Sequence, residues 1–220
     1  MKVLVVHYGG CTFEASICLF QGANWFVNKS VTLPFEAGNK IKEMLVQHIF
    51  EDLKNNHKGA VFNEEIESDI RHELSKSCDR AIYALSQKEQ THIKMNVKMI
   101  YEVDKLLKRS DLERLTAQMA NHINEQLDEL LSQARLRKHQ ISKVIIEGGS
   151  AQAHWVIQLL ERFVEDPGKI LTTKHSAAEL AALGAMTAAQ EYKENRDSAS
   201  QYSGSSGSHI ASFKLNRPPD

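Results

Sequence analysis

Two pairs of adjacent glycines are the residues in this sequence best suited to hold a ligand. Gly9-Gly10 ends one apolar run near the start of the chain, and Gly148-Gly149 ends another. Glycine has no Cβ, so a bound group can approach the backbone closely and the chain can adopt a positive φ. Consecutive N–H groups in such a turn can form an anion-binding concavity. Taken alone, the first pair is more simply an ordinary hairpin, because a bare Gly-Gly matches no phosphate-binding fingerprint.

Strands are expected to carry both glycine pairs. Residues 3–6 are continuously apolar, which is typical of a strand buried on both faces. Residues 12–19 alternate between apolar and polar side chains, which is typical of a half-buried strand. Residues 143–147 predict another strand, after which the second glycine pair and Ser150 open a helix. A strand that ends in glycines at a helix N-terminus can bind phosphate or the edge of a nucleotide.

Strand and helix patterns also alternate through the middle of the chain. A strand is predicted over 25–33, and a helix from about residue 39. Asn63 is expected to cap a second long helix. Two further strands are predicted over 91–99 and 101–107.

The last third of the sequence predicts helices and a tail. Ser110 and Glu113 have the spacing of a capping box, in which each side chain satisfies a free N–H at the start of a helix. Small residues in an alanine-rich helix over 177–192 imply close packing against the sheet. From residue 197 the sequence is rich in Ser and Gly and is expected to be disordered.

Composition excludes several classes of protein. The 27 basic and 28 acidic residues give no basic footprint for nucleic acid, and no apolar run approaches the length of a membrane span. The three cysteines form no CxxC pair, and the ten histidines show no metal-ligand spacing, so no zinc site is predicted. We therefore expect a cytoplasmic protein that binds neither nucleic acid nor membrane.

Five segments, taken in order, resemble the second (distal) lobe of the nucleotide-binding domain of the heat-shock protein 70 family. They are VVHYGGCTFEASI, KSCDRAIYALS, LKRSDLERL, SKVIIEGGSAQAHWVIQLL and KHSAAELAALGAMTAA. The resemblance covers about residues 2–190 and implies an α/β fold, an actin-like ATPase (RNase-H-like) lobe with an inserted α+β outer subdomain. The core would comprise 1–35 plus 109–195, the insertion 36–108, and the disordered tail 196–220.

The resemblance also implies a nucleotide site. Three residues would face the β- and γ-phosphates: Gly9, Gly10 and Thr12. Three would line the adenine pocket: Asp79, Tyr83 and Ser86. Three would lie along the adenosine: Gly148, Gly149 and Ser150.

The residues that differ from the family pattern lie mainly at the positions expected to bind magnesium, phosphate and adenine. His7 stands where the family has an aspartate that helps to place water and magnesium, and imidazole is a poor ligand for Mg²⁺. Cys11 replaces a third glycine, which would cost free energy if that position needs a positive φ or a close approach of phosphate. Ile82 and Tyr83 replace the lysine and arginine that flank adenine. The resemblance thus implies weak contact with ATP or ADP, leaves Mg²⁺ open, and assigns no catalytic or metal-binding residue.

Three functions follow from this pattern. The first is an ATP-binding protein of the chaperone family, reduced to one lobe and lacking ATPase activity of its own. The second is a non-catalytic interaction module, or decoy, that binds nucleotide-exchange co-chaperones or other chaperones. The third is half of an active ATPase whose first lobe is missing from this chain, since no such lobe precedes Lys2 in this sequence. The remaining alternative is a decayed duplicate of a family member, without a selected role.

Overall fold

The computed structural model describes residues 1–21, 24–57, 62–97, 101–151, 153–171 and 177–202. The chain divides into two compact units, Met1–Thr172 and Thr173–Asp220. The first unit contains the sheet, the two long middle helices and both glycine pairs.

A mixed five-stranded sheet forms the centre of the first unit, in the order β3-β2-β1-β6-β7. Its strands are β1 (Lys2–Tyr8), β2 (Thr12–Gln21), β3 (Asn24–Pro34), β6 (Lys143–Glu147) and β7 (Ile170–Leu171). The first three are antiparallel neighbours, while β6 pairs parallel with both β1 and β7. The predicted strands at both glycine pairs are confirmed, and the two pairs lie at the ends of adjacent parallel strands.

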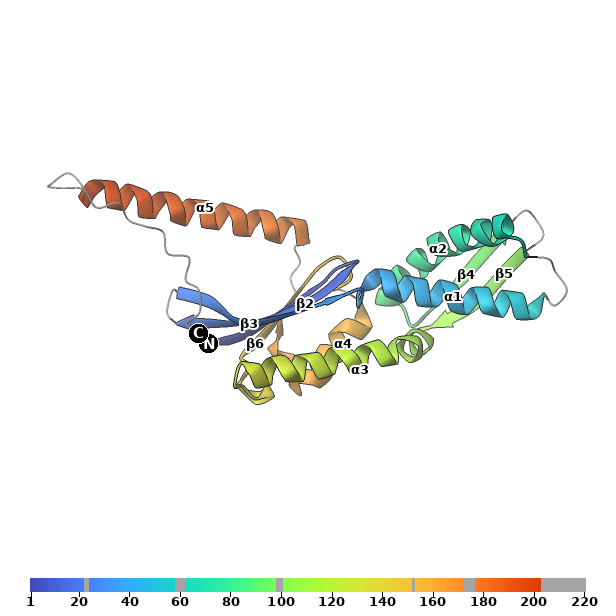
Figure 1. Ribbon diagram of the computed structural model, residues 1–220, viewed down its shortest axis with the longest axis horizontal. Helices are drawn as coiled ribbons and strands as arrows, with labels where there is room; N and C mark the ends of the chain where they lie inside the picture. The colour runs from blue at the N-terminus through green and yellow to red at the C-terminus, as the bar shows by residue number, and fades with distance from the viewer. Residues whose placement is uncertain (22–23, 58–61, 98–100, 152, 172–176, 203–220) are drawn as a thin grey trace. The chain divides into compact units, whose positions relative to one another are not determined.

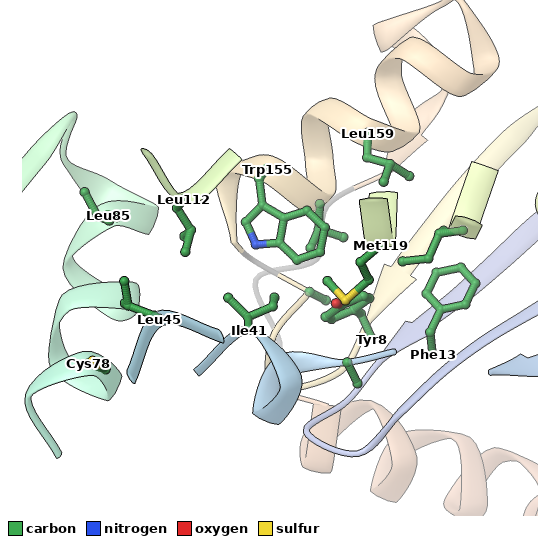
Figure 2. Packing of buried hydrophobic residues seen from close by; sticks show 14 of the residues in the cluster. Tyr8, Phe13, Ile41, Leu45, Cys78, Leu85, Leu112, Met119, Trp155 and Leu159 are labelled. Atoms are coloured by element: carbon green, nitrogen blue, oxygen red, sulfur yellow. The ribbon is translucent and has the colours of Figure 1, made fainter. Parts of the chain in front are cut away.

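Two helices lie against one face of this sheet, α3 (Arg109–Gln133) and α4 (His154–Val164) (Figure 1). Tyr8 on β1 is almost fully buried and makes edge-to-face contacts with Phe13 and Trp155, at 5.9 and 5.3 Å between ring centroids. Figure 2 shows these rings gathered around Met119 in the core. Burial raises the pKa of the Tyr8 phenol, and the nearby Glu36 carboxylate adds to that shift. Tyr8 therefore acts as an apolar core residue.

Beyond the sheet, α1 (Gly38–Asn56) and α2 (Glu64–Gln87) pack beside the hairpin of β4 (Gln90–Val97) and β5 (Tyr101–Lys108) (Figure 1). The predicted cap on α2 is confirmed, since Asn63 Oδ1 accepts a hydrogen bond from the Ile66 N–H at 2.9 Å. That residues 36–108 form a separate subdomain stays a prediction.

The start of α3 differs from the capping box expected at Ser110. The helix begins at Arg109, and the Asp111 carboxylate accepts a hydrogen bond from the Lys108 N–H at 3.1 Å. Tertiary contacts explain the earlier start. The Arg109 guanidinium donates to the Leu85 carbonyl at 2.7 Å, and the backbone N–H of Arg109 donates to the Glu89 carbonyl at 3.0 Å. Ser110 is exposed and caps nothing.

Two short 3-10 turns, η1 (Lys138–Gln140) and η2 (Pro167–Lys169), connect the remaining elements of the first unit. The second unit contains α5 (Ala177–Tyr202), which extends past the expected end near Tyr192. Residues 197–202 are therefore helical rather than disordered, and the rest of the expected tail lies outside the described residues. Packing of α5 on the sheet stays a prediction. None of the described helices has the length and apolar character needed to span a membrane.

Candidate functional site

The first glycine turn joins β1 to β2 as a closed hairpin. The Gly9 N–H donates to the Thr12 carbonyl at 3.0 Å, and neither glycine has a positive φ. A Cβ on Gly9 would lie 3.0 Å from His7 Nε2, so the imidazole ring, rather than the backbone conformation, favours glycine there. The cost expected for Cys11 from a positive φ does not arise, because this residue does not lie in the left-handed region either, and the cost expected from a close approach of phosphate stays a prediction.

The N-terminus of α1 binds this hairpin. The Gly38 N–H donates to the Gly9 carbonyl at 3.1 Å, and the Asn39 N–H donates to the Gly10 carbonyl at 2.7 Å. The Asn39 side-chain amide also donates to Cys11 Sγ at 3.4 Å. The first N–H groups of α1 thus hold the protein's own carbonyls and are not free to bind an anion.

The second glycine turn needs glycine for its backbone. Gly148 has a φ of 109°, and a Cβ there would lie 2.3 Å from the Tyr8 carbonyl oxygen. That same carbonyl accepts the Ser150 N–H at 3.1 Å. The expected helix does not open at Gly149, since a turn intervenes and α4 begins at His154. A Cβ built on Gly149 would have no neighbouring atom within 4 Å.

Ser150 connects the two glycine turns through α1. A Cβ built on Gly38 would lie 2.2 Å from Ser150 Oγ and 3.3 Å from the Gly9 carbonyl. The serine side chain therefore packs directly on the first turn of α1, where glycine leaves room for it. Both glycine turns meet at this point, although they are about 140 residues apart in the sequence.

A cavity of about 340 Å³ opens beside this junction and is lined by three separate segments of the chain. Five of the predicted site residues line it: Asp79, Tyr83, Ser86, Gly149 and Ser150. The other four, Gly9, Gly10, Thr12 and Gly148, do not line it. The three residues expected at the phosphates thus lie outside the cavity, whereas five of the six expected at the nucleoside line it.

Sequence reasoning missed several residues of this cavity, among them Ile41, Gln87 and Trp155. Trp155 is 8% exposed, and its indole nitrogen is buried without a hydrogen-bond partner among the described residues. In Figure 2 the nitrogen edge of this ring faces Ile41 and Leu112. The sequence did carry one signal for this cavity residue, a tryptophan that follows the second glycine turn closely. Its ring is large enough to reach across that turn.

The polar groups of the cavity are mostly engaged with one another. Asp79 pairs with Lys42 at 3.4 Å. The Ser86 hydroxyl donates to the Tyr83 carbonyl at 2.6 Å, and the Gln87 amide donates to the Tyr83 hydroxyl at 3.3 Å. Tyr83 lines the cavity, and this residue is 69% exposed. The cavity therefore offers apolar residues, a carboxylate paired with a lysine and an accessible aromatic residue.

Comparison with known proteins decides the family. The model of the family described as Hsp70 protein matches residues 1–199. The chain belongs to the heat-shock protein 70 family. Its mixed sheet and covering helices are those of an actin-like ATPase lobe, as the resemblance implied.

Within the matched regions, about a quarter of the aligned residues are identical between this family member and curated relatives. It is 25% identical over 188 residues to heat shock cognate 70 kDa protein 3 of Dictyostelium discoideum, covering 84% of this chain and 29% of that protein. It is 23% identical over 190 residues to the chaperone protein DnaK of Mycoplasmopsis pulmonis, covering 84% and 31%. It is 28% identical over 188 residues to a ribosome-associated molecular chaperone of Zygosaccharomyces rouxii, covering 83% and 29%. The chain spans less than a third of the length of these relatives.

The Hsp70 family binds ATP or ADP with Mg²⁺, and the described residues at the first glycine turn of this chain do not form a set of ligands for the magnesium ion. The position next to the first glycine turn holds His7, whose Nδ1 lies 3.5 Å from Glu147 Oε1. Mg²⁺ requires hard oxygen ligands in octahedral geometry. Among the residues that the structure describes, no group of three or more His, Cys, Asp or Glu is placed to hold a metal ion.

Proposed function

We propose that this chain is an Hsp70-family lobe that holds the nucleoside part of an adenine nucleotide weakly and does not hydrolyse ATP by itself. One observation carries the proposal: the cavity of about 340 Å³ is lined by Asp79, Tyr83 and Ser86 from α2 together with Gly149 and Ser150 from the second glycine turn. Ligand sites are usually concave and largely apolar, with a few converging polar groups. The family likeness supports an adenine nucleoside as the occupant.

Tyr83 is the residue expected to hold the base. Its ring is mostly exposed, yet two hydrogen bonds from neighbouring residues restrain its backbone and its hydroxyl. An aromatic ring restrained in this way can stack on a planar base at a low entropic cost. Without the guanidinium that the family places here, we expect weak binding.

Hydrolysis requires positioned water and stabilisation of charge on the transferred phosphoryl group. The structure offers His7 in contact with Glu147 instead, and the Thr12 hydroxyl donates to Glu14 Oε1 at 3.3 Å. Neither arrangement supplies positive charge where the phosphates would lie. We therefore expect no ATP turnover by this chain alone.

Calorimetric titration with adenosine and with ADP tests the nucleoside site. We expect saturable heat, with a dissociation constant between about 0.1 and 1 mM, and about tenfold weaker binding by a Tyr83→Ala variant, since base stacking contributes about 1–3 kcal/mol. Trp25→Ala is the matched control, because Trp25 is 62% exposed on β3 outside the cavity. Absence of heat with both ligands at millimolar concentration would remove the proposal.

An interaction module is the second candidate, favoured by a groove between α1 and α2. The groove has a volume of about 560 Å³, and its lining combines charged residues, among them Lys40, Glu51 and Arg71, with the apolar Met44 and Val46 of α1 and Leu115 of α3. Such a mixture of charged and apolar residues suits a protein partner such as a nucleotide-exchange co-chaperone. Binding of a purified exchange factor that an Arg71→Glu variant loses would support this candidate, and equal binding by both would count against the groove.

A further inference from the structure

Another cavity, of about 190 Å³, lies between α3 and α4 and is called the α3–α4 cleft below. Its apolar lining includes Ala117 and Ala120 of α3 and Leu159 of α4. The two alanines leave space between the helices, because larger side chains at these positions would fill the cleft. Most of the remaining residues that line it are polar.

Side-chain amides line the cleft without partners in the protein. Asn124 is half-buried, and its Oδ1 atom is buried without a hydrogen bond from any described residue. Asn121 and Gln158 line the same cleft, and the described part of the chain makes no hydrogen bond to either side chain. An unpaired buried acceptor destabilises a protein. Such an atom in a cavity therefore points to a donor from outside the chain.

Opposite charges lie at the two ends of the cleft. Glu113 lies beside Trp155, since these two residues also line a smaller cavity next to the cleft. Arg162 follows Trp155 on the same face of α4, two turns and about 10 Å further along the helix axis. Neither charged side chain forms an ion pair with a residue that the structure describes. The cleft is therefore negative near the start of α4 and positive near its end.

This order of groups matches a short peptide with free ends. An α-ammonium group can pair with Glu113, and an α-carboxylate can accept two hydrogen bonds from the Arg162 guanidinium. Side-chain amides such as that of Asn124 carry a donor and an acceptor, as the peptide group itself does. An extended chain spans about 3.3–3.6 Å per residue, so about three residues cover the distance between the two charges.

We propose that the α3–α4 cleft binds peptides of about three residues in an extended conformation. The amino end lies toward Glu113 and the carboxyl end toward Arg162. The amides of Asn121, Asn124 and Gln158 bond to the peptide groups between these ends. This site is independent of the proposed nucleoside site, although Trp155 lines both cavities.

Tryptophan fluorescence can measure this binding. The chain has two tryptophans, so a Trp25→Phe variant leaves Trp155, which lines the cleft, as the only reporter. The full chain is titrated with trialanine, with N-acetyl-trialanine and with trialanine amide, and each affinity is repeated by calorimetry. We expect a dissociation constant of about 0.1–1 mM for trialanine and at least about fivefold weaker binding of each blocked peptide.

Charge removal then assigns the two ends. Glu113→Gln should remove the preference for a free amino end, and Arg162→Gln should remove the preference for a free carboxyl end. Glu161→Gln and Arg114→Gln are the matched controls, because these residues lie on the same two helices and do not line the cleft. Both controls should keep the preferences of the parent.

Two further variants test the cleft itself. Asn124→Leu removes the unpartnered oxygen, so it should weaken trialanine binding at least about tenfold and raise the urea midpoint of the free protein. A purely structural role of Asn124 would lower that midpoint instead. Ala120→Leu places a larger side chain in the cleft and should abolish binding, with the helical circular dichroism signal unchanged.

Each outcome decides the proposal. Loss of the end preferences in Glu113→Gln and Arg162→Gln, with both kept in the controls, would support it. Equal binding of free and blocked peptides would overturn it, as would undiminished binding by Ala120→Leu. Absence of trialanine binding at millimolar concentration would show a cleft filled by water only. That result overturns the peptide site and leaves the nucleoside site, which adenosine tests separately, in place.

Discussion

Gly148 is the residue on which the geometry of the second glycine turn depends. Its positive φ and the 2.3 Å approach to the Tyr8 carbonyl leave no room for a side chain. Its neighbour Gly149 has open space around it and no positive φ. Two adjacent glycines of the same motif therefore differ completely in their tolerance of substitution, which the letters of the sequence cannot show.

Substitution of these glycines separates the two roles. Gly148→Ala should lower the free energy of unfolding by roughly 2 kcal/mol or more, because both backbone strain and a clash with a carbonyl act there. Gly149→Ala should change it by less than about 0.5 kcal/mol. Urea denaturation followed by circular dichroism measures both. Similar losses in the two variants would contradict the turn described here.

The three cysteines differ in burial and should differ in reactivity. Burial, with a smaller contribution from Asp79, raises the pKa of the Cys78 thiol to about 12, and burial also raises the pKa of Cys18. Cys11 is exposed beside the first glycine turn. At pH 8 an aromatic disulfide reagent should label one thiol rapidly in the folded protein and three in denaturant. Cys11→Ser should abolish the rapid phase, and its persistence would show that another thiol is accessible.

At the scale of elements, sequence reasoning predicted one helix cap correctly and another wrongly. Asn63 was predicted and found to cap α2, because an Asn that precedes an acidic first turn is a local signal. The serine expected to cap α3 does not, since contacts of Arg109 with α2 move the helix start. Local spacing predicted the presence of both helices, whereas tertiary bonds determined where α3 begins.

The cap of α3 can be tested by a pair of substitutions. Asp111→Ala removes the carboxylate that accepts the Lys108 N–H and should cost about 1 kcal/mol of stability. Ser110→Ala should be nearly neutral, because that exposed side chain caps nothing. Thermal and urea denaturation of both variants give the comparison. A larger loss for Ser110→Ala would restore the capping box that the sequence suggested.

An ion pair connects α1 to β5 and should respond to acid. Lys105 Nζ contacts the Asp52 carboxylate and lies 3.2 Å from His48 Nε2. The hydrogen bond from Lys105, opposed by some desolvation, lowers the pKa of Asp52 below its ordinary value. Because the folded pKa is depressed, its stabilising contribution is complete above about pH 4 and is lost as the pH falls through the folded pKa.

Lys105→Met should therefore flatten the fall in stability below pH 4. The measurement is the urea midpoint between pH 6 and pH 2.5, compared with the parent and with Lys88→Met, whose exposed side chain lies at the end of α2. Since Asp52 is 43% exposed, solvent screens this pair and the change should be modest. An unchanged acid slope in Lys105→Met would show that the pair does not contribute.

On the scale of the whole first unit, the sequence predicted the two glycine turns and the family, but not how the turns are joined. Motif order was sufficient for the fold, because five collinear segments fix the succession of strands and helices. The junction of Gly9, Gly38 and Ser150 depends on contacts between segments far apart in the sequence. The position of Trp155 in the cavity depends on the turn that delays α4 until His154.

The central claim is that the cavity beside this junction holds a nucleoside. Titration of the isotopically labelled protein with adenosine, followed residue by residue in amide NMR spectra, tests this claim most directly. The account predicts saturable shifts gathered at residues 79–87, 38–41 and 149–155, with little change along the groove between α1 and α2. Shifts centred on that groove, or a spectrum that adenosine leaves unchanged at millimolar concentration, would contradict it.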